Sequence, residues 1–177
     1  MKVGVIGAGT MGGGIAQAFA QVEGYEVCLC DLTDAFAEGG KKRIEKGLAG
    51  RVAKGKLTQE EMDQILGRIH TGTKEICKPD CLFATNTSSL SITEIGAGLD
   101  RPVTGMHFFN PAPVMKLVEV IYGLNTPQET VDRITAIAEN IGKTVVPMQE
   151  FAGFVVNRIL IPMINEAIGV YADNGVP

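Results

Sequence analysis

A glycine-rich turn at residues 7–12 constrains the fold of this chain more than any other feature of its sequence. The run Gly7-Ala8-Gly9-Thr10-Met11-Gly12 follows an apolar stretch at 2–6 and precedes a segment with apolar residues at helical spacing. Strand, glycine turn and helix in this order predict the start of a βαβ unit. The first glycine permits the tight turn, the second lets a pyrophosphate approach the backbone, and the third lets helix and strand pack closely.

A carboxylate follows at the distance that a dinucleotide site requires. Residues 26–30 predict a second buried strand, and Asp31 comes directly after it, nineteen residues after Gly12. An acidic side chain there accepts hydrogen bonds from both ribose hydroxyls and repels a 2′-phosphate, which favours NAD over NADP. The predicted cofactor-binding residues are Gly7, Ala8, Gly9, Thr10, Met11, Gly12 and Asp31.

Composition excludes several classes of function. The 177 residues suffice for one sizeable core, and a net charge of −4 argues against a nucleic-acid surface. The apolar run 154–171 contains Arg158, Pro162 and Glu166, which argues against a membrane span. We expect a cytoplasmic location, because no basic export segment precedes the first strand. The cysteines, Cys28 with Cys30 and Cys77 with Cys81, lack the usual zinc spacing, so we expect reduced thiols and no metal.

A long polar segment at 34–56 predicts a helix that projects from the sheet and turns back through a second helix. Thr58 and Glu61 predict a capping box at the start of that second helix. Phe36, Ile44 and Leu48 are expected on the buried stripe of the first. The projecting region is rich in basic residues: Lys41, Lys42, Arg43, Lys46, Arg51, Lys54 and Lys56. Their pattern leaves two interpretations open, a solvated helix face and a dock for an anionic group.

The second half of the chain alternates further strands and helices. Strands are predicted at 81–85, 103–108, 115–122 and 143–148, with helices capped by Ser91 and by Thr126. Ligands bind at the carboxyl ends of strands in open α/β sheets. We therefore expect the loops that carry Gly9, Ser88 and His107 to converge.

A histidine and a glutamate flank a proline turn symmetrically. His107 and Glu119 each lie six residues from Pro113, so a hairpin would bring them face to face across two antiparallel strands. A carboxylate that orients a histidine in this way favours the charged imidazole. The pair is a candidate general acid/base.

Five motifs together resemble the 3-hydroxyacyl-CoA dehydrogenases, nearest to the bacterial 3-hydroxybutyryl-CoA dehydrogenases. They cover nearly the whole chain in the family's order. The motifs are the glycine run 7–12, Asn86-Thr87-Ser88-Ser89-Leu90, Met106-His107-Phe108-Phe109-Asn110-Pro111, Met115-Lys116-Leu117-Val118-Glu119 and Gly153-Phe154-Val155-Val156-Asn157-Arg158.

The resemblance implies an α/β fold of the Rossmann type, doubly wound, with a mainly parallel sheet and a projecting helical pair. It implies an NAD-binding domain at 1–150 and the first helix of a helical domain at 151–177. By the same resemblance His107 is the catalytic base, held by Glu119, while Ser88 binds the reacting oxygen and Asn110 lies near the nicotinamide. Lys54 and Lys56 are expected to contact CoA, and the C-terminal helix to form a homodimer.

The chain departs from the family at two places. A βα unit, on the order of 30 residues, is absent between Thr73 and Lys74, and the helical domain stops after its first helix. The sheet must then close over a gap or leave two edges unpaired. We expect the apolar helix 154–171 to pack on another copy or on the nucleotide domain.

Three functions remain open from the sequence. The leading one is NAD-dependent interconversion of 3-hydroxyacyl-CoA and 3-oxoacyl-CoA in fatty acid or butyrate metabolism. The alternatives are a dehydrogenase of free 3-hydroxy acids, which needs no basic dock for CoA, and a non-catalytic NAD-binding or structural protein. We expect NAD binding to be retained and turnover to be much reduced.

Overall fold

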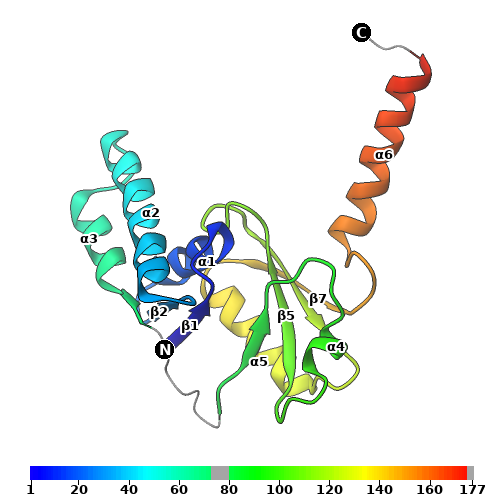
Figure 1. The fold of residues 1–177 in the computed structure, drawn as a ribbon, viewed down its shortest axis with the longest axis horizontal. Helices are drawn as coiled ribbons and strands as arrows, with labels where there is room; N and C mark the ends of the chain where they lie inside the picture. Colours follow the sequence, from blue (N-terminus) through cyan, green and yellow to red (C-terminus); the bar gives the residue numbers. More distant parts are fainter. Residues whose placement is uncertain (73–79, 175–177) are drawn as a thin grey trace. The chain divides into compact units, whose positions relative to one another are not determined.

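The computed structural model describes residues 1–72 and 80–174 and divides into two compact units (Figure 1). The first unit comprises Met1–Cys81, Phe108–Leu117 and Glu139–Thr144, and the second comprises Leu82–His107, Val118–Ala138 and Val145–Pro177. The predicted junction between Thr73 and Lys74, and Cys77, lie outside the described residues.

The first unit is built on a three-stranded sheet in the order β1-β2-β3. Its elements follow the chain as β1 (Lys2–Ile6), α1 (Thr10–Ala20), β2 (Glu26–Cys30), α2 (Asp34–Ala53), α3 (Gln59–Gly67) and β3 (Ile69–Thr71). Both strand pairs are parallel, with Val5 opposite Leu29 and Val27 opposite Ile69. This is the expected strand, glycine turn, helix and strand order.

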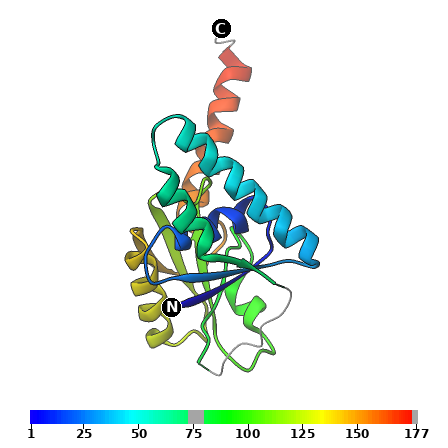
Figure 2. The same ribbon diagram turned by 90° about the vertical axis from the view of Figure 1, so that its left-hand side faces the viewer.

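Helices α2 and α3 lie side by side and extend beyond the end of this sheet (Figure 1, Figure 2). Thr58 and Glu61 form the predicted capping box, with Thr58 N donating to Glu61 Oε2 at 2.7 Å. Ile44 and Leu48 are buried as predicted, but Phe36 is 59% exposed, so its place on the stripe is wrong. Ala37 and Gly40 occupy the buried face instead, because α2 packs too closely there for a large side chain.

The second unit is built on a four-stranded sheet in the order β4-β5-β6-β7. Its elements are β4 (Phe83–Thr85), α4 (Ile92–Gly96), β5 (Val103–Phe108), β6 (Leu117–Tyr122), α5 (Gln128–Asn140), β7 (Thr144–Gln149) and α6 (Val156–Asn174), and several ends lie in the first unit. Strand β4 is parallel to β5. The core of this unit is a cluster of buried apolar side chains from Ile92, Val103, Ile121, Met148 and Phe154.

Several predicted boundaries in this half need correction. Strand β4 begins at Phe83 rather than Cys81, and β6 begins at Leu117 rather than Met115. Thr126 does not cap α5 through its side chain, because its Oγ1 donates to the Val103 carbonyl at 3.0 Å. The Pro127 carbonyl accepts from the Thr130 and Val131 amides instead. The Ser91 cap is confirmed, since its Oγ accepts from Glu94 N at 3.2 Å.

The two sheets leave one edge of β1 and one edge of β4 without a strand partner among residues 1–72 and 80–174. The two expected consequences of the absent βα unit, closure over a gap and two unpaired edges, stay predictions, because they depend on how the two units are placed. Ile6 at the end of β1 is 90% exposed.

Helix α6 extends away from the four-stranded sheet of its own unit (Figure 1). It begins at Val156, two residues after the predicted start, and contains Pro162; its large side chains from Ile159 to Tyr171 are exposed. The expected packing of this helix on another copy or on the nucleotide domain stays a prediction. In the part of the chain that the structure describes, no helix has the length and apolar character to cross a membrane.

Candidate active site

The glycine turn has the geometry that its three glycines predict. Gly7 adopts a φ of +96°, which favours glycine, and its amide donates to the Cys30 carbonyl at 2.8 Å. A Cβ at Gly12 would lie 1.7 Å from the Gly7 carbonyl oxygen, whereas a Cβ at Gly9 would meet nothing within 4 Å. The turn is thus closed towards its own strand and open where a pyrophosphate would approach.

Asp31 lies at the end of β2 and is tied to the same turn. Its Oδ2 accepts from Ala8 N and its Oδ1 from Leu32 N, both at 2.7 Å. These two backbone donors, with a smaller contribution from the Arg43 charge, hold the pKa of Asp31 below its usual value. The side chain is therefore a fixed anion beside the glycine turn, as ribose binding requires.

Helix α2 contributes to this site in a way that the sequence did not reveal. A Cβ at Gly40 would lie 2.6 Å from Ala8 Cβ and 2.8 Å from Ala8 O. One turn further along, Arg43 Nη2 donates to the Ala8 carbonyl at 2.6 Å. The two contacts fix α2 against the glycine turn and line a cavity of about 150 Å³ there. In the sequence Arg43 is one of seven basic residues of the projecting region, and only the fold brings its guanidinium to the glycine turn.

His107 and Glu119 form the predicted pair in the second unit. His107 Nδ1 lies 2.7 Å from Glu119 Oε2, and the residues are 6% and 1% exposed. They stand on β5 and β6, which are neighbours in the sheet. A buried charge is tolerated where it is paired and hydrogen-bonded, and both conditions hold for Glu119.

The other oxygen of Glu119 is held by backbone amides at the start of α6. Oε1 accepts from Val155 N and from Val156 N, each at 3.0 Å. Glu119 thus accepts from two amides that can only donate, and we assign the proton of its contact with the imidazole to His107 Nδ1. In the neutral ring Nε2 then carries the lone pair that can accept a proton. The sequence predicted the dyad but not this third partner.

Ser88 is exposed in the loop that follows β4, in the same unit as the dyad. Its carbonyl accepts from Asn157 Nδ2 at 3.3 Å, which ties this loop to the first turn of α6. Thr87 Oγ1 accepts from Ser89 N and Leu90 N, at 3.4 Å and 3.0 Å. The loop is thus ordered by its own side chains and by α6.

Glu150 is a further residue of this unit that sequence reasoning missed. Its carboxylate accepts from Thr93 N at 2.9 Å and from Ser91 Oγ at 3.2 Å, and it also accepts from Thr93 Oγ1. Burial alone would raise the pKa of Glu150, but these hydrogen bonds outweigh burial and lower it. Glu150 caps α4 from nearly sixty residues away, so no local pattern could have indicated it.

The remaining predicted residues lie in the first unit. Asn110 is exposed in the turn after β5, and this turn packs on α1, where a Cβ at Gly14 would lie 3.4 Å from Ala112 Cβ. Lys54 ends α2 and Lys56 follows it, and both are exposed. The predicted convergence of Gly9 with Ser88 and His107 joins the two units and stays a prediction.

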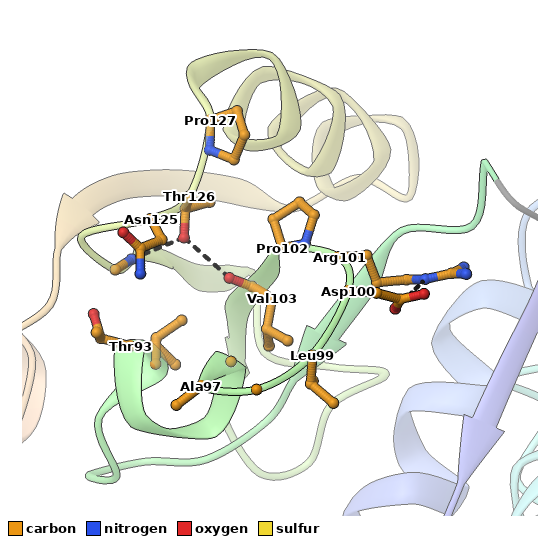
Figure 3. A pocket seen from close by; sticks show the side chains of 14 residues that line it. Thr93, Ala97, Leu99, Asp100, Arg101, Pro102, Val103, Asn125, Thr126 and Pro127 are labelled. Carbon is orange, nitrogen blue, oxygen red and sulfur yellow. Dashed lines mark hydrogen bonds and ion pairs between the residues drawn. The ribbon is translucent and has the colours of Figure 1, made fainter.

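A larger cavity, of about 330 Å³, lies in the second unit but apart from the dyad (Figure 3). Its walls are α4, the loop 97–102 and the segment before α5. Val103 lines it at the start of β5, whereas His107 is near the end of that strand, roughly 13 Å away at the usual rise per residue. This cavity therefore belongs to neither predicted site.

Metal ligands are not grouped in the described ranges, 1–72 and 80–174, where no three His, Cys, Asp or Glu side chains could hold one ion. Cys28 Sγ and Cys30 Sγ lie 3.5 Å apart, a distance of a thiol hydrogen bond rather than a disulfide.

The model of the protein family described as "3-hydroxyacyl-CoA dehydrogenase, NAD binding domain" matches residues 2–75 and 69–151 of this chain. A 3-hydroxybutyryl-CoA dehydrogenase of Clostridioides difficile is 44% identical over 204 aligned residues, covering 98% of this chain and 72% of the relative. A probable 3-hydroxybutyryl-CoA dehydrogenase of Bacillus subtilis is 45% identical, covering 93% and 68%.

Solved structures of the same kind are similar in fold. The (S)-3-hydroxybutyryl-CoA dehydrogenase PaaH1 of Ralstonia eutropha superposes with a TM-score of 0.89 at 37% identity, covering 99% of this chain and 72% of that structure. FadB2 of M. tuberculosis superposes with a TM-score of 0.90 at 33% identity, covering 98% and 72%.

Proposed function

Because this chain belongs to the 3-hydroxyacyl-CoA dehydrogenase family, we propose that it interconverts a 3-hydroxyacyl-CoA and the 3-oxoacyl-CoA, with 3-hydroxybutyryl-CoA as the first substrate to test. The observation that carries the proposal is the buried His107–Glu119 pair, whose 2.7 Å contact orients a proton acceptor. The same chain carries an intact dinucleotide turn with Asp31.

The cofactor is NAD, in keeping with the family's NAD-binding domain. The chain's own residues fit it: the turn 7–12 is open at Gly9, and Asp31 is a fixed anion. We assign the pyrophosphate to the amides at the start of α1 and the ribose hydroxyls to Asp31. Asn110 is assigned to the nicotinamide side.

In the oxidation, His107 Nε2 takes the proton of the substrate's 3-hydroxyl, and Glu119 stabilises the imidazolium that forms. NAD, when bound, supplies the acceptor for the hydride that leaves C3. In the reduction, His107 returns the proton to the carbonyl oxygen. Ser88 donates a hydrogen bond to that oxygen and so positions the substrate.

The substrate's CoA portion is assigned to the exposed basic end of α2. Lys54 and Lys56 present compact charges there, suited to a phosphate. The exposed apolar side chains of α6 favour a homodimer through this helix. We place the protein in the cytoplasm and the reaction in fatty acid or butyrate metabolism.

We expect turnover to be lower than that of the curated relatives. The C. difficile alignment extends over 204 positions against 177 residues here, so part of the relative has no counterpart within the aligned range of this chain. The two family matches overlap at 69–75, the place where we expect the βα unit to be absent. Strands β3 and β4 flank the same junction in the sequence, and one edge of β4 has no strand partner among residues 1–72 and 80–174.

The test is NADH oxidation by the purified chain with acetoacetyl-CoA, compared with a His107→Gln variant. We expect a measurable rate for the chain and loss of at least 100-fold in the variant, a typical value for a general base. Calorimetric titration of NAD into both proteins is the control, because His107→Gln leaves the glycine turn untouched. A rate that is equal in the two proteins would contradict the role of His107.

The unpaired sheet edges also favour a second candidate, a non-catalytic NAD-binding protein. It predicts NAD binding without any acetoacetyl-CoA-dependent oxidation of NADH. A dehydrogenase of free 3-hydroxy acids would turn over 3-hydroxybutyrate and would not be inhibited by free CoA. The two assays above separate the first two functions, and turnover of 3-hydroxybutyrate with and without free CoA separates the third.

A further inference from the structure

The turn between β7 and α6 has an unusual backbone. Gly153 and Phe154 both have positive φ, +78° and +51°. Among the described residues Phe154 alone combines a side chain with a positive φ, and for a bulky aromatic residue this conformation is an outlier. Strain of this kind persists only where the surroundings impose it, and it gathers at functional sites.

The turn has two contacts with the dyad. It aims the consecutive amides of Val155 and Val156 at Glu119 Oε1, each at 3.0 Å. Successive amides that point to one side of a left-handed turn form a concave site for an anion. The Phe154 ring is 1% exposed, and its centroid lies 5.7 Å from that of the His107 ring in an edge-on arrangement.

We propose that the Gly153–Phe154 turn is a positioning element of the proton-transfer site. Its amides hold Glu119 as an oriented anion, and this anion keeps the proton on His107 Nδ1 and leaves the lone pair on Nε2. The ring of Phe154 limits rotation of the imidazole. The inference relies on the proposed function only for the use of that lone pair.

A purely structural role for the turn is the competing explanation, because Phe154 is also part of the core cluster of its unit. A core-packing role predicts that substitutions here change the stability of the fold and leave the hydrogen bonding of His107 unchanged. A positioning role predicts that the substitutions change the hydrogen bonding and proton exchange of the His107 imidazole. The chain suits this distinction, since it has two histidines and His70 is exposed in the other unit.

The test is nitrogen NMR of the imidazoles in the ligand-free chain, with a Gly153→Ala substitution. At Gly153 a Cβ is strained by the positive φ and would lie 3.2 Å from Arg158 N, within the first turn of α6. Gly98→Ala is the matched control, because Gly98 has the same φ of +78°, lies in the same unit and has open space around it. His70 serves as an internal reference.

We expect Gly153→Ala to speed solvent exchange of the His107 Nδ1 proton by roughly tenfold, from the cost of a left-handed alanine. Gly98→Ala should leave it within about twofold. In the active chain Gly153→Ala should lower kcat without changing the affinity for NAD. A folded Gly153→Ala variant with an unchanged His107 signal, or an equal change in Gly98→Ala, would overturn the proposal.

Gly153→Asn covers the case in which the alanine variant does not fold, because asparagine tolerates positive φ better. A smaller change of the His107 signal in the same direction supports the proposal, and an unchanged signal refutes it. The spectra need neither NAD nor acyl-CoA. A chain without dehydrogenase activity therefore leaves this test intact.

Discussion

Replacing Glu119 with glutamine should invert the hydrogen bonding of His107 while keeping the shape of the site. Glu119 accepts from His107 Nδ1 through one oxygen and from two backbone amides through the other. Glutamine has one accepting and one donating end. Because the backbone amides can only donate, the glutamine oxygen must face them, and its NH₂ group then faces Nδ1.

The consequence is a change of tautomer. Nδ1 must accept from the glutamine, so the neutral ring carries its proton on Nε2 and cannot take one from the substrate. All three hydrogen bonds remain paired but lose their charge assistance, so the free energy of unfolding should fall by only about 2 kcal/mol. The rate should fall by about 10²- to 10⁴-fold, the range for loss of a general base or its correct tautomer.

The assay combines the rate of NADH oxidation, nitrogen NMR of the imidazoles and chemical denaturation of Glu119→Gln. Glu150→Gln is the control, because Glu150 is a glutamate of the same unit that accepts hydrogen bonds from Ser91 and Thr93. It should lose similar stability and keep the His107 tautomer. A Glu119→Gln variant with a kcat within about threefold of the parent and an Nδ1 proton on His107 would refute the reasoning.

Three further predictions concern the scaffold and the substrate dock. Gly40→Ala should destabilise the fold by about 1–3 kcal/mol in chemical denaturation and weaken NAD binding, because its Cβ would lie 2.6 Å from Ala8 Cβ in the glycine turn. Gly47→Ala, in open space on the same helix, should stabilise the fold by up to about 1 kcal/mol in the same assay. Glu150→Gln should lower the free energy of unfolding by about 1–2 kcal/mol at neutral pH. Since the folded pKa of Glu150 is lowered, this difference should be present above the ordinary value of 4.5 and disappear as the pH falls through the folded pKa. Charge reversal of Lys54 and Lys56 should raise the KM for acetoacetyl-CoA several-fold and leave NAD affinity unchanged. An unchanged KM would contradict the assignment of the CoA portion to these two lysines.

The sequence predicted those parts of the structure that depend on short-range pattern. The glycine turn, the capping box at Thr58 and the pairing of His107 with Glu119 all follow from spacing within about a dozen residues. Each depends on geometry that a strand, a turn or a helix fixes by itself. These are also the features on which the proposed chemistry depends.

Contacts between distant segments could not be predicted in this way. Arg43 reaches the glycine turn from α2, and Glu150 caps α4 from the far end of β7. The prediction that Phe36 lies on the buried stripe is wrong, because helical spacing does not show how closely a helix approaches its neighbour. The strained conformation of Phe154 has no signature in sequence, since left-handed turns are normally read from glycine or asparagine.

Transfer of deuterium from C4-deuterated NADH to acetoacetyl-CoA, followed by mass spectrometry of the product, tests the central claim most directly. It detects slow turnover that absorbance can miss. We predict deuterium at C3 of 3-hydroxybutyryl-CoA with the unmodified chain, and at least 100-fold less with His107→Gln. A folded chain that binds NAD and gives no deuterated product would contradict the account.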